Sequence, residues 1–165
     1  MNLKERKPYK ILFVCLGNIC RSPAAEGVMA RIIEERCLSN QFYLDSAGTY
    51  GGHAGDMPDR RMRVHARERG YELTHRSRRV VGSDFDVFDI IVAMDSSNVY
   101  TLKNMASTLE EERKIVQMGQ YIRRFPQYDY VPDPYYEGSE GFELVLDLLE
   151  DACEALLDDI LEKDK

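Results

Sequence analysis

The stretch from Ile11 to Pro23 constrains this chain more than any other. Ile11 begins four apolar residues, which are typical of a short buried strand, and Pro23 suits the first position of a following helix. Ser22, directly before Pro23, is a suitable N-cap. The pattern therefore predicts a strand, a tight loop that starts at Cys15, and a helix from Ser22 to about Cys37.

The predicted loop has the features of an anion site. A helix N-terminus directs backbone N–H groups and a positive dipole at a bound anion. Arg21 can hold two phosphate oxygens with its planar guanidinium. Cys15 in such a loop is expected to be partly thiolate near neutral pH, and hence nucleophilic. Taken alone, Cys15 would favour an ordinary buried thiol, but together with Arg21 and Ser22 it predicts attack on a bound phosphate ester.

At these residues the sequence resembles the low-molecular-weight protein tyrosine phosphatases. Their signature is a cysteine, five residues and then Arg-Ser, with an inner Gly-Asn-x-Cys; it matches Cys15, Gly17, Asn18, Cys20, Arg21 and Ser22. The resemblance implies that Cys15 is the nucleophile, that Arg21 clamps the phosphate and stabilises the transition state, and that Ser22 stabilises the departing thiolate. The phosphate-binding residues it implies are Leu16, Gly17, Asn18, Ile19, Cys20 and Arg21.

Length and composition fit one soluble globular domain. The 165 residues are enough for a substantial core, and the 44% hydrophobic and 31% charged residues are typical of such a domain. We expect residues 1–165 to form one phosphatase domain, with 1–8 as an N-terminal extension. The net charge of -7 argues against nucleic acid as a partner. No apolar run approaches the ~20 residues that span a bilayer, so no membrane association is expected.

The cysteines indicate a reducing compartment. Cys15, Cys20, Cys37 and Cys153 show no Cys-x2-Cys pairing typical of zinc sites, and the N-terminus lacks the apolar core of a secretory signal. We therefore expect a cytoplasmic protein without metal or cofactor. Cys20 is either a structural thiol or a redox partner that condenses with oxidised Cys15; the resemblance favours the redox role.

Strand and helix patterns alternate along the rest of the chain. Further strands are expected at 41–45, 89–94 and 114–118, an extended segment near 78–81, and helices at 58–69, about 96–106 and 142–161. Residues 49–58 and 125–138 are predicted loops. The order predicts an α/β fold: a single domain with a small central parallel sheet of about four strands and helices on both faces. The phosphate-binding loop then lies between the first strand and the first helix, at the carboxyl end of the sheet.

Charge is unevenly distributed. Residues 60–79 are rich in arginine, whereas the last predicted helix is strongly acidic. An arginine-rich face could attract phosphorylated or acidic partners, but a solvated helix face is the commoner explanation.

Asp133 is the candidate general acid. Expulsion of a phenolate from a phosphate is slow without a proton donor, and two flanking prolines restrict the backbone that carries this carboxyl. Asp-Pro is also a common turn. The resemblance implies that Asp133 is the acid and later the base. It also implies that Tyr135 and Tyr136 form a wall of the substrate cleft and match family sites of regulatory phosphorylation.

Further positions match family residues that support the loop. Asn18 tolerates a left-handed backbone conformation, and Ser46 and His75 match the serine and histidine of its hydrogen-bond network. Asp95 matches another family position but would also serve as a helix cap.

One position departs from the family. Many members carry a tryptophan beside the substrate ring where Gly52, followed by His53, stands here. We expect a more open substrate cleft on that side, with Tyr50 as a nearby substitute.

The predicted function is hydrolysis of phosphotyrosine in proteins, and of small aryl phosphates, through a phosphocysteine intermediate. A thioredoxin-coupled arsenate reductase would need two more cysteines between Cys37 and Cys153. Protein-arginine phosphatases usually carry threonine where Ile19 stands and have a reduced tyrosine wall. A phosphotyrosine-binding relic would lack Cys15, Arg21 or Asp133.

The expected partners follow from this chemistry. They are a tyrosine-phosphorylated protein, with a tyrosine kinase among the candidates, and inorganic phosphate or sulfate in the active site. We expect a monomer, with weak self-association left open.

Overall fold

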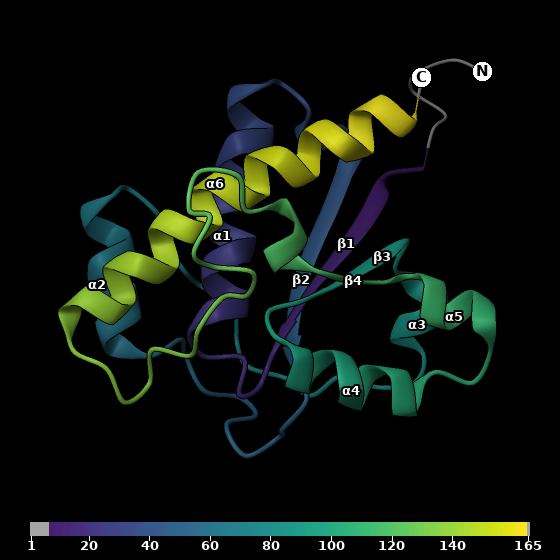
Figure 1. The fold of residues 1–165 in the computed structure, drawn as a ribbon, viewed down its shortest axis with the longest axis horizontal. Helices are drawn as coiled ribbons and strands as arrows, with labels where there is room; N and C mark the ends of the chain where they lie inside the picture. Colours follow the sequence, from purple (N-terminus) through teal and green to yellow (C-terminus); the bar gives the residue numbers. More distant parts are fainter. Residues whose placement is uncertain (1–6, 165) are drawn as a thin grey trace.

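A four-stranded parallel sheet forms the centre of the computed structural model, which describes residues 7–164 (Figure 1). The strand order is β2-β1-β3-β4, and the strands are β1 (Tyr9–Cys15), β2 (Phe42–Gly48), β3 (Ile90–Ala93) and β4 (Ile115–Gln117). This arrangement confirms the predicted α/β fold. The N-terminal extension expected at 1–8 lies mostly outside the described residues.

Helices cover both faces of the sheet (Figure 1). The helices of the described chain are α1 (Arg21–Glu35), α2 (Arg60–Glu68), α3 (Asp84–Val87), α4 (Ser96–Met105), α5 (Leu109–Arg113) and α6 (Ser139–Lys163), with 3-10 turns η2 (Ser39–Gln41) and η3 (Met118–Tyr121). The sequence did not predict α3 and α5, because four or five residues are too few to show a helical period. Within residues 7–164 no helix is long and apolar enough to cross a membrane.

The core lies on the two faces of β1. Ile11 and Phe13 pack on the side of α1 and α6, whereas Leu12 and Val14 pack on the side of α3 and α4. All four side chains are fully buried. A central parallel strand that is covered on both faces requires this unbroken apolar run, which is why the first strand was easy to predict.

The predicted start of the first helix is wrong. Helix α1 begins at Arg21, with Cys20 in the N-cap position and no side-chain cap, so Pro23 is the third helical residue and not the first. The Ser22 hydroxyl does not cap the helix because it binds Cys15 and Asn18 instead. In the described part of the chain, the N–H groups of Arg21 and Ser22 at the helix start donate to no protein acceptor.

The other predicted elements shift by a few residues. β2 continues to Gly48, three residues beyond the predicted strand, because it pairs with β1 as far as Cys15. The extended segment near 78–81 forms a single bridge, between Gly48 and Arg79. Helix α2 ends before Gly70, as predicted, and Gly70 has a φ of +88° that other residues rarely adopt.

Candidate active site

The predicted phosphate loop has its carbonyl groups turned outward. The oxygens of Leu16, Gly17 and Ile19 accept hydrogen bonds from the Tyr50 N–H, the Ser77 hydroxyl and the Asp59 N–H, at 2.8, 3.0 and 2.7 Å. Within residues 7–164, the N–H groups of residues 17–20 donate to no backbone or side-chain acceptor. Together with the free first turn of α1, these donors form the arrangement that binds an anion.

Two backbone features hold this loop in shape. Asn18 adopts a φ of 57°, the left-handed conformation that asparagine tolerates better than most residues. Gly48 lies directly against the loop, because a Cβ added there would stand 2.6 Å from the Leu16 carbonyl oxygen. A larger residue at position 48 would displace the loop.

Cys15 is connected to a buried chain of polar groups. Its Sγ lies 3.0 Å from the Ser22 Oγ, and the Asn18 amide donates to the hydroxyls of Ser22 and Ser46 at 2.7 and 3.1 Å. Since Asn18 donates to Ser22, the Ser22 hydroxyl proton can be given to an acceptor, and the Cys15 sulfur at 3.0 Å is nearer than the Ala47 carbonyl oxygen at 3.4 Å. The Ser46 hydroxyl in turn donates to Glu26 at 2.8 Å.

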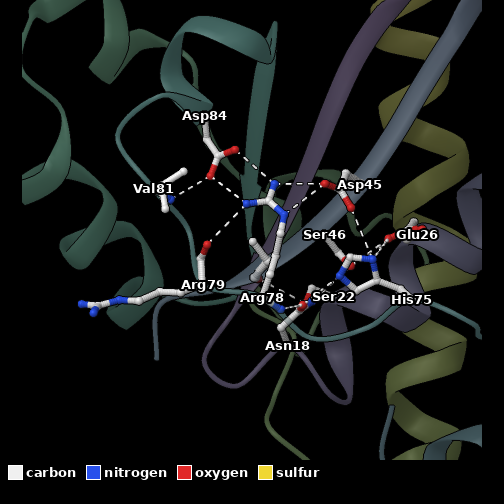
Figure 2. Close-up of polar contacts among 11 residues, drawn as sticks. Asn18, Ser22, Glu26, Asp45, Ser46, His75, Arg78, Arg79, Val81 and Asp84 are labelled. Atoms are coloured by element: carbon white, nitrogen blue, oxygen red, sulfur yellow. Dashed lines mark hydrogen bonds and ion pairs between the residues drawn. The ribbon is translucent and has the colours of Figure 1, made fainter. Parts of the chain in front are cut away.

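The amide oxygen of Asn18 determines which ring nitrogen of His75 carries a proton. It accepts from His75 Nε2 and from the Arg78 N–H, both at 3.0 Å, as Figure 2 shows. His75 Nε2 must therefore carry a proton. Its Nδ1 faces Glu26 and Asp45 at 3.5 and 3.3 Å, so at least one further proton is needed among these three groups to avoid repulsion.

The titration of this cluster is strongly perturbed. Burial raises the pKa of Glu26 to about 7, with a further contribution from Asp45. Burial also lowers the pKa of His75. Glu26 is thus the group that takes up the extra proton as the pH falls through about 7. It was missed in the sequence, where a glutamate on the first helix resembles any solvated residue.

Arg21 is buried beneath the cleft with only 2% of its surface exposed. Its Nη1 donates to Asp95 Oδ2 at 2.7 Å and to the Val131 carbonyl at 2.9 Å. Burial acts to lower the pKa of Arg21, but Cys15 and Asp95 outweigh it, so the pKa is raised. The guanidinium therefore remains charged and fixed in orientation.

Asp133 reaches the same place from the distant proline-rich loop. Its Oδ2 lies 3.6 Å from Arg21 Nη2, and its Oδ1 accepts the Tyr135 N–H at 3.0 Å. The side chain is 40% exposed, so it is accessible to a ligand. The Asp-Pro turn, which the sequence offered as an alternative explanation for Asp133, is present, and the carboxyl of Asp133 also lines the cleft.

A cleft of about 220 Å³ joins these groups, lined by Cys15, Leu16, Gly17, Ile19, Cys20, Arg21, Tyr50, His53, Asp133, Tyr135 and Tyr136. Gly52 is not among its described lining residues. A Cβ at Gly52 would collide with the Tyr50 ring, so Gly52 leaves room for Tyr50, which together with His53 forms the wall. His53 packs edge-to-face on Tyr50, and its Nδ1 lies 3.3 Å from Asp56.

Cys20 also faces this cleft, but its chemistry differs from that expected of Cys15. Burial raises the pKa of the Cys20 thiol, and the nearby Asp59 adds to the shift. The thiol therefore stays protonated near neutral pH. Both cysteines are free and buried.

Arg61 connects the phosphate loop with the loop that carries Tyr135, and the sequence did not predict this role. Asp59 accepts from the Arg61 Nε and Nη2 at 3.1 and 3.0 Å, and the guanidinium lies over the rings of Tyr135 and Phe142 at 5.4 and 4.8 Å. Asp59 itself donates its N–H to Ile19 of the phosphate loop. No local sequence pattern connects residue 61 with residue 135.

The sequence profile of the low molecular weight phosphotyrosine protein phosphatases matches residues 10–165. The chain belongs to this family. A family relative from Synechocystis is 47% identical over 148 residues, which cover 90% of this chain and 94% of the relative. The protein tyrosine phosphatase of Entamoeba histolytica, solved with Hepes in its active site, has a TM-score of 0.91 and 46% identity and covers 95% of this chain and 99% of its own.

A second family structure is similar to a lesser degree. The Drosophila arginine phosphatase has a TM-score of 0.85 and 35% identity, and the match covers 92% of this chain and 97% of that one. The fold is therefore common to proteins whose names record different substrates.

Proposed function

We propose that this phosphatase hydrolyses phosphotyrosine in proteins, and small aryl phosphates, through a phosphocysteine intermediate. One observation carries the proposal: Cys15, Arg21 and Asp133 face a single tyrosine-lined cleft above the free N–H groups of the loop. The Hepes bound in the Entamoeba enzyme is a sulfonate, which is a tetrahedral anion like phosphate, and this also supports the proposal.

In the first step the Cys15 thiolate attacks phosphorus. The phosphate is held by the loop N–H groups and by Arg21, which balance the charge of the transition state. The bond between phosphorus and the phenolic oxygen breaks, and Asp133 gives its proton to that oxygen. The products are tyrosine and a phosphorylated Cys15, with Asp133 as a carboxylate.

In the second step water regenerates the enzyme. The Asp133 carboxylate takes a proton from water as the water oxygen attacks phosphorus. The sulfur–phosphorus bond breaks, and the departing Cys15 thiolate is stabilised by the Ser22 hydroxyl, which lies 3.0 Å away. Inorganic phosphate leaves, and Asp133 is again protonated.

The walls of the cleft favour an aromatic substrate. One loop contributes Tyr50 and His53 to the lining, and the proline-rich loop contributes Tyr135 and Tyr136. Leu16 and Ile19 add apolar surface. A phenyl ring would bury its faces against these side chains, whereas a phosphorylated guanidinium gains less from them.

The substrate class is tested with matched peptides that carry phosphotyrosine, phosphoserine or phosphoarginine in one sequence. We expect the largest kcat/KM for phosphotyrosine. A preference for phosphoarginine would overturn the proposal in favour of the activity named for the Drosophila protein.

The biological setting follows from the same chemistry. A catalytic thiol needs a reducing compartment, which is consistent with the cytoplasm. The physiological partner would be a tyrosine-phosphorylated protein, with a tyrosine kinase among the candidates. A monomer suffices, because the cleft is complete within one chain.

A further inference from the structure

The arginine-rich segment 60–79 contains eight arginines that fall into two groups. Arg61, Arg67, Arg69 and Arg78 form ion pairs with carboxylates of this chain. Arg69 alone binds three acidic residues of α6, so a purely solvated face is the wrong description for it. Among the described residues, no carboxylate lies within 4.0 Å of the second group, Arg60, Arg63, Arg76 and Arg79.

Three arginines of the second group lie along the loop that carries His53. The Arg63 Nε donates to the Pro58 carbonyl at 3.0 Å, and the Arg76 Nη1 donates to the Gly55 carbonyl at 3.3 Å. The Arg79 stem packs on Gly51, where an added Cβ would lie 3.3 Å from its Cδ. We call Arg63, Arg76 and Arg79 the arginine rim.

The arginine rim places unpaired positive charge on one side of the substrate cleft. Its loop forms the wall that contains Tyr50 and His53. The only carboxylate of residues 49–58, Asp56, already faces His53 at 3.3 Å. Figure 2 shows Arg79 extending away from the acidic cluster that surrounds its neighbour Arg78.

This charge contrasts with the rest of the molecule. The chain has a net charge of -7, and the cleft also contains the acidic Asp133 from the proline-rich loop. A local positive surface on an acidic protein attracts acidic ligands and orients them. Each rim guanidinium also has N–H donors left over, and a guanidinium binds a carboxylate with two parallel hydrogen bonds.

We propose that the arginine rim binds acidic residues that flank the phosphotyrosine of the substrate protein. This inference rests on the proposed function and adds a substrate class to it. Because His53 of the loop 51–58 lines the cleft, we expect the polypeptide on one side of a phosphotyrosine held at Arg21 to cross this loop. Glutamate or aspartate at that point meets Arg76 and Arg79, whose contacts with the loop already restrict their motion.

The experiment compares two phosphotyrosine peptides, one with glutamates and one with lysines on both sides of the phosphotyrosine. We expect kcat/KM to favour the acidic peptide about 10-fold at low ionic strength, mainly through KM, and the preference to shrink in high salt. The variant Arg76→Glu/Arg79→Glu should abolish or reverse this preference. Its turnover of p-nitrophenyl phosphate, which has no flanking residues, should be unchanged.

A matched control makes the same change in charge elsewhere. Lys103→Glu/Arg113→Glu alters residues of α4 and α5, and neither residue has an ion pair in the described chain. The control should keep the peptide preference. Equal kcat/KM values for both peptides in the unmodified enzyme, or an equal loss of preference in the control, would overturn the proposal that the arginine rim binds acidic residues. Absence of any phosphotyrosine hydrolysis would instead overturn the proposed function.

Discussion

Arg21 Nη1 and Asp95 Oδ2 lie 2.7 Å apart, and the other oxygen of Asp95 accepts the Asn98 N–H at 2.9 Å to cap α4. The Asn98 side chain completes a capping box. Asp95 therefore caps α4, as the sequence allowed, and its other oxygen also binds Arg21. The helix that follows β3 holds the carboxylate still, and the carboxylate holds the buried guanidinium under the cleft.

Asp95→Asn separates these two roles. Asparagine caps a helix about as well as aspartate, but it cannot balance the Arg21 charge. We expect kcat/KM for p-nitrophenyl phosphate to fall by roughly 10- to 150-fold, because a hydrogen bond between charged groups contributes about 1.5–3 kcal/mol. Steady-state kinetics measure the loss, and circular dichroism shows whether helix content is retained. Wild-type kinetics in this variant would show that Asp95 does not contribute to catalysis.

Cys15→Ser should abolish turnover of p-nitrophenyl phosphate, because the alcohol is a far weaker nucleophile than the thiolate at neutral pH. Phosphate binding, measured by calorimetry, should persist because the loop N–H groups are unchanged. Cys37→Ser is the matched control, since Cys37 is exposed and distant in sequence from the site. Retained turnover in Cys15→Ser would refute the assignment of the nucleophile.

Asp133→Ala should slow the formation of phosphocysteine by ~10²–10⁴ for substrates with poor leaving groups. The reason is that a phenolate of high basicity needs the proton that Asp133 supplies. The loss should shrink for good leaving groups, which rapid-quench measurements across a series of aryl phosphates would reveal. Asp129→Ala, in the same loop, serves as control. A loss independent of the leaving group would indicate that Asp133 is not the acid.

Glu26 should make the enzyme less stable as pH rises. Its pKa is about 4.3 in an unfolded chain, and burial raises it to about 7 in the fold. Between these values the folded state binds more protons, so the free energy of unfolding falls with rising pH. Glu26→Gln removes this dependence, and the variant should gain about 2–3 kcal/mol on the wild type between pH 4.5 and 8.

Urea unfolding at several pH values measures this gain. Burial lowers the pKa of His75, so its contribution to the free energy of unfolding rises with pH. His75 is present in both proteins, so the comparison isolates Glu26. Glu34→Gln changes an exposed residue of the same helix and should parallel the wild type. Parallel curves for Glu26→Gln as well would contradict the proton assignment within the cluster.

Much of the site could be predicted because its key residues are close together in the chain. Cys15 lies at the end of β1, and Arg21 and Ser22 open the helix that follows, so one short stretch with its inner Gly-Asn-x-Cys contains the signature that indicates the chemistry. The two prolines beside Asp133 fitted a general acid and an ordinary turn equally well, and the family resemblance pointed to the acid. The helix start was placed wrongly because the Ser22 hydroxyl, a suitable cap by local rules, binds Cys15 and Asn18 instead.

Other features depend on packing between distant segments. Arg61 meets Tyr135 only because α2 and α6 pack side by side. Glu26 acquires its perturbed pKa from burial beside Asp45 of β2. The arginine rim exists because residues 63, 76 and 79 return to one loop. The nucleophile loop could be inferred from neighbouring residues in the sequence. Burial, desolvation and long-range contacts have no local sequence pattern, so the residues that support this loop and the charge around the cleft were decided by the tertiary structure.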